Sequence, residues 1–123
     1  MNFETFKEKF LTTEGRLNRL KYFKYLLISI IGFLVVDIAL QMPVAIITGD
    51  SEGTLITIVN VVAQFAWFMI YLCLVIRRLH DLNRRDLFAF LVLVPLVNLI
   101  FEIYLLFFKG TNGFNQYGPD PLL

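Results

Sequence analysis

The chain is 123 residues long, which suits a single domain. Hydrophobic residues make up 58% of it and charged residues only 17%, so a soluble domain of this size could not cover its apolar surface. Composition therefore excludes an ordinary water-soluble fold and predicts an all-α membrane protein. The net charge is only +1, and we expect no nucleic-acid partner. A lone Cys73 inside an apolar run excludes a disulfide framework and a cysteine-based metal motif.

Residues 1–21 are predicted to form an interfacial and juxtamembrane segment. Phe3, Phe6 and Phe10 recur at helical spacing with Glu and Lys between them. This pattern is typical of a short amphipathic helix that lies in the headgroup plane with its aromatic rings in the bilayer. The alternative is a solvated helix that packs the same aromatic stripe against the body of the protein.

Three apolar runs follow, over residues 22–48, 54–76 and 87–108, and a polar tail occupies residues 109–123. Each run is long enough to cross a bilayer, since roughly 20 helical residues span the hydrocarbon core. The sequence thus predicts a small bundle of three transmembrane helices within one integral membrane domain, residues 1–123.

The run 87–108 leaves two paths open, because Pro95 lies near its middle. Proline removes a helical hydrogen bond there, and the nearby Asn98 can satisfy freed backbone groups. One path is a single kinked span that places the tail outside. The other is a re-entrant pair of half-helices that returns the tail to the cytoplasm.

Basic residues predict the orientation. Lys and Arg gather before the first span, four arginines lie in the charged segment 77–86, and none lies in the acidic turn 49–53. Because cytoplasmic loops of membrane proteins are enriched in Lys and Arg, the N-terminus and segment 77–86 are predicted to be cytoplasmic.

Several polar residues interrupt the apolar runs and form a predicted intramembrane polar layer: Asp37, Gln41, Asn60, Gln64, Asn98 and Glu102. Two antiparallel helices would set Asp37 beside Gln64 and Gln41 beside Asn60, because each helix presents these residues four positions apart. Glu102 joins the layer if the third run is a single span, whereas a re-entrant path returns it towards the cytoplasm. Such a layer either fixes helix packing by hydrogen bonds or lines a proton, cation or small-solute path.

The segment 77–86 is the main candidate site. On a helix, Arg77 and Arg85 would each lie four residues from Asp81 and could pair with it. Arginines at an interface also suit anionic headgroups or a phosphate-bearing ligand. The candidate lipid-binding or partner-binding residues are Arg16, Arg19, Arg77, Arg78, His80, Asp81, Arg84 and Arg85.

Catalytic chemistry finds little support in the sequence. His80 and Asp81 could form a catalytic or metal-binding pair, but neither a second histidine nor a suitable nucleophile lies nearby. We therefore assign no catalytic, cofactor-binding or metal-binding residues, expect no cofactor, and predict that the protein is not an enzyme.

Three motifs together resemble one family: Gly15-Arg16-Leu17-Asn18-Arg19 followed by Tyr22, Arg77-Arg78-Leu79-His80-Asp81, and the tail 109–121. Their order and spacing resemble the domain-of-unknown-function 805 family of bacterial inner-membrane proteins. The chain departs from the family pattern after Asp81, where Leu82 and Asn83 replace the usual glycine-containing continuation. The resemblance implies a location and a fold, and no chemistry. If the tail is cytoplasmic, all three motifs converge on one surface.

These observations predict a multi-pass protein of the bacterial inner membrane with a basic cytoplasmic face that binds anionic lipid or a protein partner. The alternative is a subunit of an oligomeric small-solute or ion transporter or channel that uses the polar layer. The expected partners are the bilayer itself and either further copies of the chain or a larger membrane protein.

Overall fold

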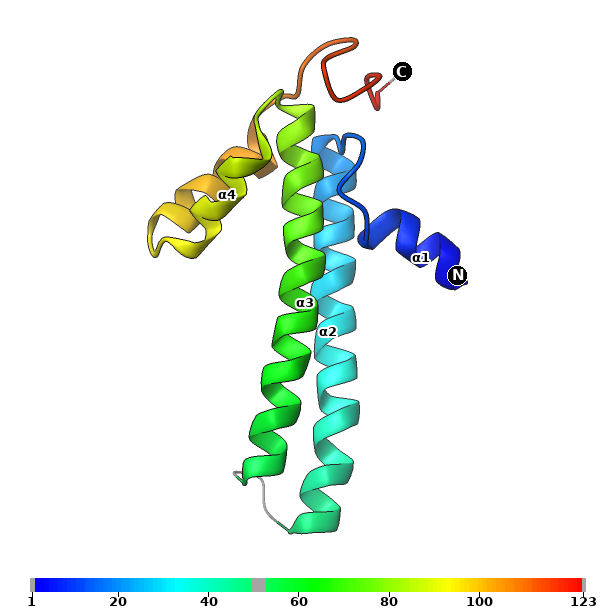
Figure 1. Ribbon diagram of the computed structural model, residues 1–123, viewed down its shortest axis with the longest axis vertical. Helices are drawn as coiled ribbons and strands as arrows, with labels where there is room; N and C mark the ends of the chain where they lie inside the picture. The colour runs from blue at the N-terminus through cyan, green and yellow to red at the C-terminus, as the bar shows by residue number, and fades with distance from the viewer. Residues whose placement is uncertain (1, 50–52, 123) are drawn as a thin grey trace.

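The computed structural model describes residues 2–49 and 53–122, which form five helices and no strand. Two long helices, α2 (Arg19–Thr48) and α3 (Thr54–Asp81), run side by side in opposite directions (Figure 1). Each is long and apolar enough to cross a membrane. The 30 residues of α2 extend about 45 Å, which exceeds a hydrocarbon core of roughly 30 Å.

Local sequence explains the ends of α2. The Asn18 side chain accepts a hydrogen bond of 2.8 Å from the Lys21 N–H and caps the first turn. At the other end Gly49 adopts φ 68°, the left-handed conformation that commonly terminates a helix. α2 ends at Thr48 and α3 begins at Thr54, where the apolar runs 22–48 and 54–76 end and begin, while both helices extend beyond those runs at the opposite end.

The charged segment 77–86 is part helix and part loop. The helix α3 continues through Asp81, and the chain turns out of the helix at Asn83. Asn83 has φ 57°, a conformation that asparagine tolerates better than most residues. Around it, the Asn83 N–H donates to His80 O and the Arg84 N–H to Leu79 O, the two bonds of a Schellman motif. The first half of the segment is thus the last helical turn of α3 and only the second half is a loop.

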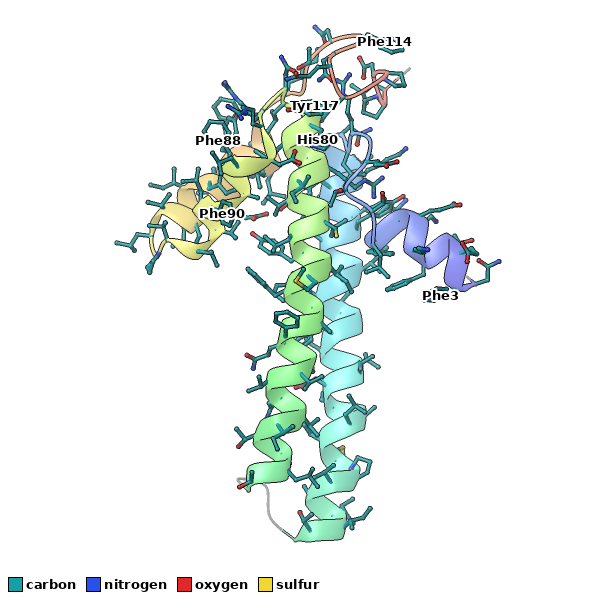
Figure 2. The ribbon with its side chains drawn as sticks, viewed as in Figure 1. Phe3, His80, Phe88, Phe90, Phe114 and Tyr117 are labelled. Atoms are coloured by element: carbon teal, nitrogen blue, oxygen red, sulfur yellow. The ribbon has the colours of Figure 1, made fainter. Side chains whose placement is uncertain are left out.

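The predicted amphipathic helix is present as α1 (Phe3–Phe10). Phe10 is buried, and its ring centroid lies 5.3 Å from that of Tyr25 on α2. Phe6 stacks on Phe10, whereas Phe3 is 68% exposed (Figure 2). The aromatic stripe therefore packs partly against the protein, and its first residue points away from it.

The third apolar run does not form one spanning helix. It divides into a 3₁₀ helix, η1 (Asp86–Leu93), and a short α-helix, α4 (Val97–Phe107), which fold back on each other as a hairpin (Figure 1). The turn contains Pro95 and Leu96, and Leu96 adopts φ 69°, an uncommon conformation for a branched residue. The chain thus folds back here, as the second of the two predicted paths requires, and a single spanning helix over 87–108 is not confirmed.

A buried core lies at the end of the molecule where the hairpin, the tail and the N-terminal segment meet. It brings together apolar side chains from the N-terminal segment, α2, α3 and the hairpin, namely Phe10, Leu17, Tyr22, Leu74, Val75, Leu79, Ala89, Val92, Phe101 and Leu105. Outside this core, most large apolar side chains of α2 and α3 are exposed, as expected for helices that contact lipid.

Candidate functional site

Three buried charged residues form the centre of the candidate site, which we name the Arg–Asp–Arg cluster: Arg16, Arg78 and Asp81. The Arg16 guanidinium lies 2.9 Å from Asp81 Oδ1, and the Arg78 guanidinium lies 2.6 Å from Asp81 Oδ2. The three side chains are 1%, 0% and 4% exposed. One carboxylate thus bridges two guanidinium groups away from water.

Backbone carbonyl groups of the tail accept hydrogen bonds from the N–H groups of Arg16 that do not contact Asp81. Its Nη1 donates to Gly113 O at 2.6 Å and to Gly118 O at 3.1 Å, and its Nη2 donates to Thr111 O at 2.6 Å. Arg16 therefore joins the segment before α2 to the tail.

Arg78 makes a second set of backbone contacts. Its Nε donates to Leu105 O at 2.7 Å, its Nη1 to Leu17 O at 3.2 Å, and its Nη2 to Phe108 O. Leu105 and Phe108 lie at the C-terminal end of α4, where the carbonyl groups carry partial negative charge. These carbonyl groups compensate the excess positive charge of the cluster.

The tail also bonds directly to the end of α3. The Thr111 N–H donates to Asp81 O at 2.7 Å, and Asn115 Nδ2 donates to His80 O at 2.9 Å. Gly110 passes so close that an added Cβ would lie 2.0 Å from Asp81 Oδ2. The tail is therefore seated on α3, as the folded-back path of the third run requires.

The tail closes on itself through Asp120. Backbone N–H groups of Leu122 and Gly113 each donate to the Asp120 carboxylate at 2.9 Å, and they lower the pKa of this carboxyl. Asn115 and Gly118 exchange two backbone bonds of 3.1 Å. These turns hold the tail carbonyl groups in place for Arg16.

His80 does not pair with Asp81. Its Nδ1 lies 3.0 Å from Gly15 O, its Nε2 contacts the Asp86 carboxylate, and its ring stacks on Tyr117 with centroids 4.0 Å apart (Figure 2). Within the described residues, no three His, Cys, Asp or Glu side chains gather in a way that could hold a metal ion. The geometry gives His80 a structural role between the loop, α3 and the tail.

The predicted helical pairs of Asp81 with Arg77 and Arg85 do not form. Asp81 faces Arg16 and Arg78 instead, and Arg77 donates from Nη1 to Lys9 O at 2.6 Å. Arg85 is exposed on the loop before η1. The predicted set thus divides into buried or half-buried residues and three exposed ones, namely Arg19, Arg84 and Arg85.

The intramembrane polar layer is only partly assembled. Gln41 Nε2 donates to Asp37 and to Asn60 Oδ1, the latter at 2.6 Å, so the expected pairing of Gln41 with Asn60 is present. Gln64 is exposed on α3, and no contact joins it to Asp37. These residues form one small polar contact between α2 and α3.

Glu102 lies apart from that contact. It accepts hydrogen bonds from Tyr22 at 2.7 Å and from Tyr71 at 2.6 Å, because the hairpin returns it towards the N-terminal end of α2. Asn98 only links the two arms of the hairpin, with Nδ2 at 3.5 Å from Val92 O. The two tyrosines were absent from the predicted site, although Tyr22 belongs to the first sequence motif.

Two long apolar helices, joined to a hairpin of exposed apolar residues, define an integral helical membrane protein. The chain also matches the model of the family described as "Protein of unknown function (DUF805)" over residues 10–119, and it belongs to that family. Similar proteins include inner membrane protein YhaH of Escherichia coli K12, at 32% identity over 89% of this chain and 86% of the relative. Inner membrane protein YhaI of the same strain is 34% identical over 87% of this chain and 83% of the relative. No solved structure matches the chain.

Proposed function

We propose that this chain is a non-enzymatic inner membrane protein whose exposed cytoplasmic arginines and lysines bind anionic phospholipid headgroups. The observation that carries the proposal is the division of its basic residues. The side chains of Arg16 and Arg78 are buried and paired with Asp81. Those of Arg84 and Arg85 are exposed beside the hairpin and form no ion pair within the described residues. Each exposed cation near an anionic membrane surface contributes about 1 kcal/mol.

The proposed topology has two spans, α2 and α3, with the N-terminus, the Arg–Asp–Arg cluster and the tail in the cytoplasm. The distribution of Lys and Arg supports this orientation. Because η1 and α4 fold back on each other, the hairpin supports a re-entrant path for the third apolar run, in which it enters the cytoplasmic leaflet and returns. Lys21, Lys24 and Lys109 are also exposed at the same end of the molecule and extend the basic face.

We expect a cysteine that replaces Asn112 to react with a membrane-impermeant maleimide in inverted vesicles, whose cytoplasmic side faces the reagent, and not in intact spheroplasts. Asn112 is exposed on the tail, and the tail is bonded to α3 beside the basic segment. Labelling is compared between intact spheroplasts and inverted vesicles, with the wild-type Cys73 as the background control. Reaction in intact spheroplasts alone would show that the tail is external and that the proposed topology is wrong.

The double variant Arg84→Gln, Arg85→Gln is expected to weaken binding of phosphatidylglycerol. Loss of two surface cations at about 1 kcal/mol each corresponds to roughly 30-fold weaker binding. Native mass spectrometry of the purified protein, titrated with phosphatidylglycerol and with phosphatidylcholine, measures the change.

The matched control for this lipid experiment is Arg84→Lys, Arg85→Lys, which keeps both charges. Because attraction to an anionic surface depends on charge more than on guanidinium shape, the lysine variant should bind nearly as well as the wild type. Equal phosphatidylglycerol binding by the glutamine variant and the wild type would contradict the proposal.

The transporter alternative has weaker support. It needs the polar residues to line one continuous path, yet Gln64 faces outwards and Glu102 bonds to Tyr22 and Tyr71 at a separate position. Asp37 keeps one observation in its favour, since its Oδ1 is buried without a hydrogen-bond partner. A single carboxyl group between two helices is insufficient to define a path.

A further inference from the structure

The molecule is much wider at one end than at the other. Figure 1 shows α1 and the η1–α4 hairpin leaving the α2–α3 pair on opposite sides, both in the half that carries the tail. In the other half, α2 and α3 contact only each other among the described elements. The molecule therefore has the shape of a wedge.

The hairpin must be in contact with lipid. Its large apolar side chains point outwards, and Leu93, Leu96 and Ile100 are 61%, 76% and 70% exposed. Phe88 and Phe90 of the same hairpin (Figure 2) are 46% and 65% exposed. In a protein of two long apolar helices, exposed apolar residues in this number favour a hydrocarbon environment.

The hairpin is too short to cross the membrane. The eight residues of η1 extend about 16 Å, and the 11 residues of α4 extend about the same. The hydrocarbon core is roughly 30 Å thick, so the hairpin reaches only its middle. Bonds from Tyr22 and Tyr71 to Glu102 hold it against the half of α2 that begins beside the Arg–Asp–Arg cluster.

The amphipathic helix α1 widens the same end of the molecule, on the opposite side of the α2–α3 pair. Below it lies an apolar groove of about 690 Å³ between α2 and α3, lined by Gly32, Ala63 and Trp67 among others. No charged side chain lines this groove, so its surface suits lipid chains. α1 itself, with Glu and Lys on one face, suits the headgroup plane above.

We propose that this wedge makes the protein a sensor of membrane curvature, which gathers where the cytoplasmic leaflet is convex. Material inserted into one leaflet only forces the lipids of that leaflet apart, and the resulting stress is relieved where that leaflet bends outwards. The inference rests on the proposed topology, in which α1 and the hairpin occupy the cytoplasmic leaflet. It requires no anionic lipid, since the driving force is the shape of the inserted part.

The test uses giant vesicles of phosphatidylcholine that contain the full-length Asn112→Cys protein, with narrow membrane tubes pulled outwards. An impermeant dye added outside labels only the molecules whose wide end faces out. For these molecules the ratio of label density in the tube to that in the vesicle should exceed one and rise as the tube narrows. Molecules labelled from inside, with the wide end facing in, should give a ratio below one.

Two variants assign the effect to the hairpin. Leu93→Lys with Leu96→Lys places two charges at its tip, which draws the tip towards the headgroups and should bring the ratio towards one. The matched control, Ile47→Lys with Leu55→Lys, adds the same charges at the narrow end and should keep the wild-type ratio. Size-exclusion chromatography in detergent verifies that each variant is folded.

A ratio at or below one for wild-type molecules labelled from outside overturns the inference, as does equal sorting of the two orientations. Both measurements use the parent protein and hold even if the tip variant fails to fold. A negative result in these vesicles leaves the proposal of anionic-lipid binding untouched, because phosphatidylcholine carries no net charge and the vesicles contain no anionic lipid. Failure of the proposed topology is detected separately by labelling Asn112→Cys in spheroplasts.

Discussion

Replacement of Asp81 by asparagine is expected to lower the free energy of unfolding by about 3–5 kcal/mol, the range for removing one member of a buried ion pair. Asp81 is the shared carboxylate of Arg16 and Arg78, whose side chains are 1% and 0% exposed. Asparagine has nearly the same shape but no charge. Two guanidinium groups would then repel each other at a buried site without an anion between them.

Asp86→Asn is the matched control for this substitution. Asp86 also contacts a basic group, His80, but its side chain is 60% exposed. Because exposed ion pairs contribute little, its cost should stay within about 1 kcal/mol. Denaturant titration of both variants in detergent micelles measures the difference. Similar stabilities for Asp81→Asn and Asp86→Asn would show that the Arg–Asp–Arg cluster is not the structural centre of the end of the molecule that carries the tail.

Gly110→Ala is expected to displace the tail from α3. An added Cβ would lie 2.0 Å from Asp81 Oδ2 and 2.9 Å from Asp81 O, and Asp81 cannot move away because Arg16 and Arg78 hold its carboxylate. Overpacking of this kind costs about 1–3 kcal/mol. The Thr111 N–H bond to Asp81 O would break first, and amide hydrogen exchange across residues 110–118 should accelerate.

Gly32→Ala is the control for the glycine experiment. Nothing lies within 4 Å of an added Cβ at Gly32, which occupies the interior of α2. Alanine there should leave stability unchanged or raise it by about 0.5–1 kcal/mol, because glycine is the poorer helix former. Unchanged exchange protection of the tail in Gly110→Ala would mean that the tail does not depend on its close approach to Asp81.

The family motifs acquire a common structural explanation from this arrangement. Arg16 comes from the first motif, Arg78 and Asp81 from the second, and the carbonyl groups of Thr111 and Gly113 from the third. They meet although nearly the whole chain separates the first motif from the third. We infer that the three motifs specify one structural unit at the end of the molecule that carries the tail, with the exposed charges of Arg19, Arg84 and Arg85 lying around it.

The two long apolar helices followed from composition, because a long apolar run in a bilayer has few alternatives to a helix. Asn18 and Gly49 mark the ends of α2 by local capping, which depends only on neighbouring residues. The pairing of Gln41 with Asn60 also followed, since two antiparallel helices of known length have a restricted register. The presence of α1 was predicted from aromatic spacing alone.

The sequence by itself therefore determined the class of protein, its two long helices and the motifs that identify its family. Only the tertiary structure decided that the third apolar run folds back and that Arg16 and Arg78 are buried. The physical reason is that both outcomes depend on partners distant in sequence. Glu102 meets Tyr22 and Tyr71, and the two arginines find carbonyl groups supplied by the tail and the end of α4, which no local pattern can indicate.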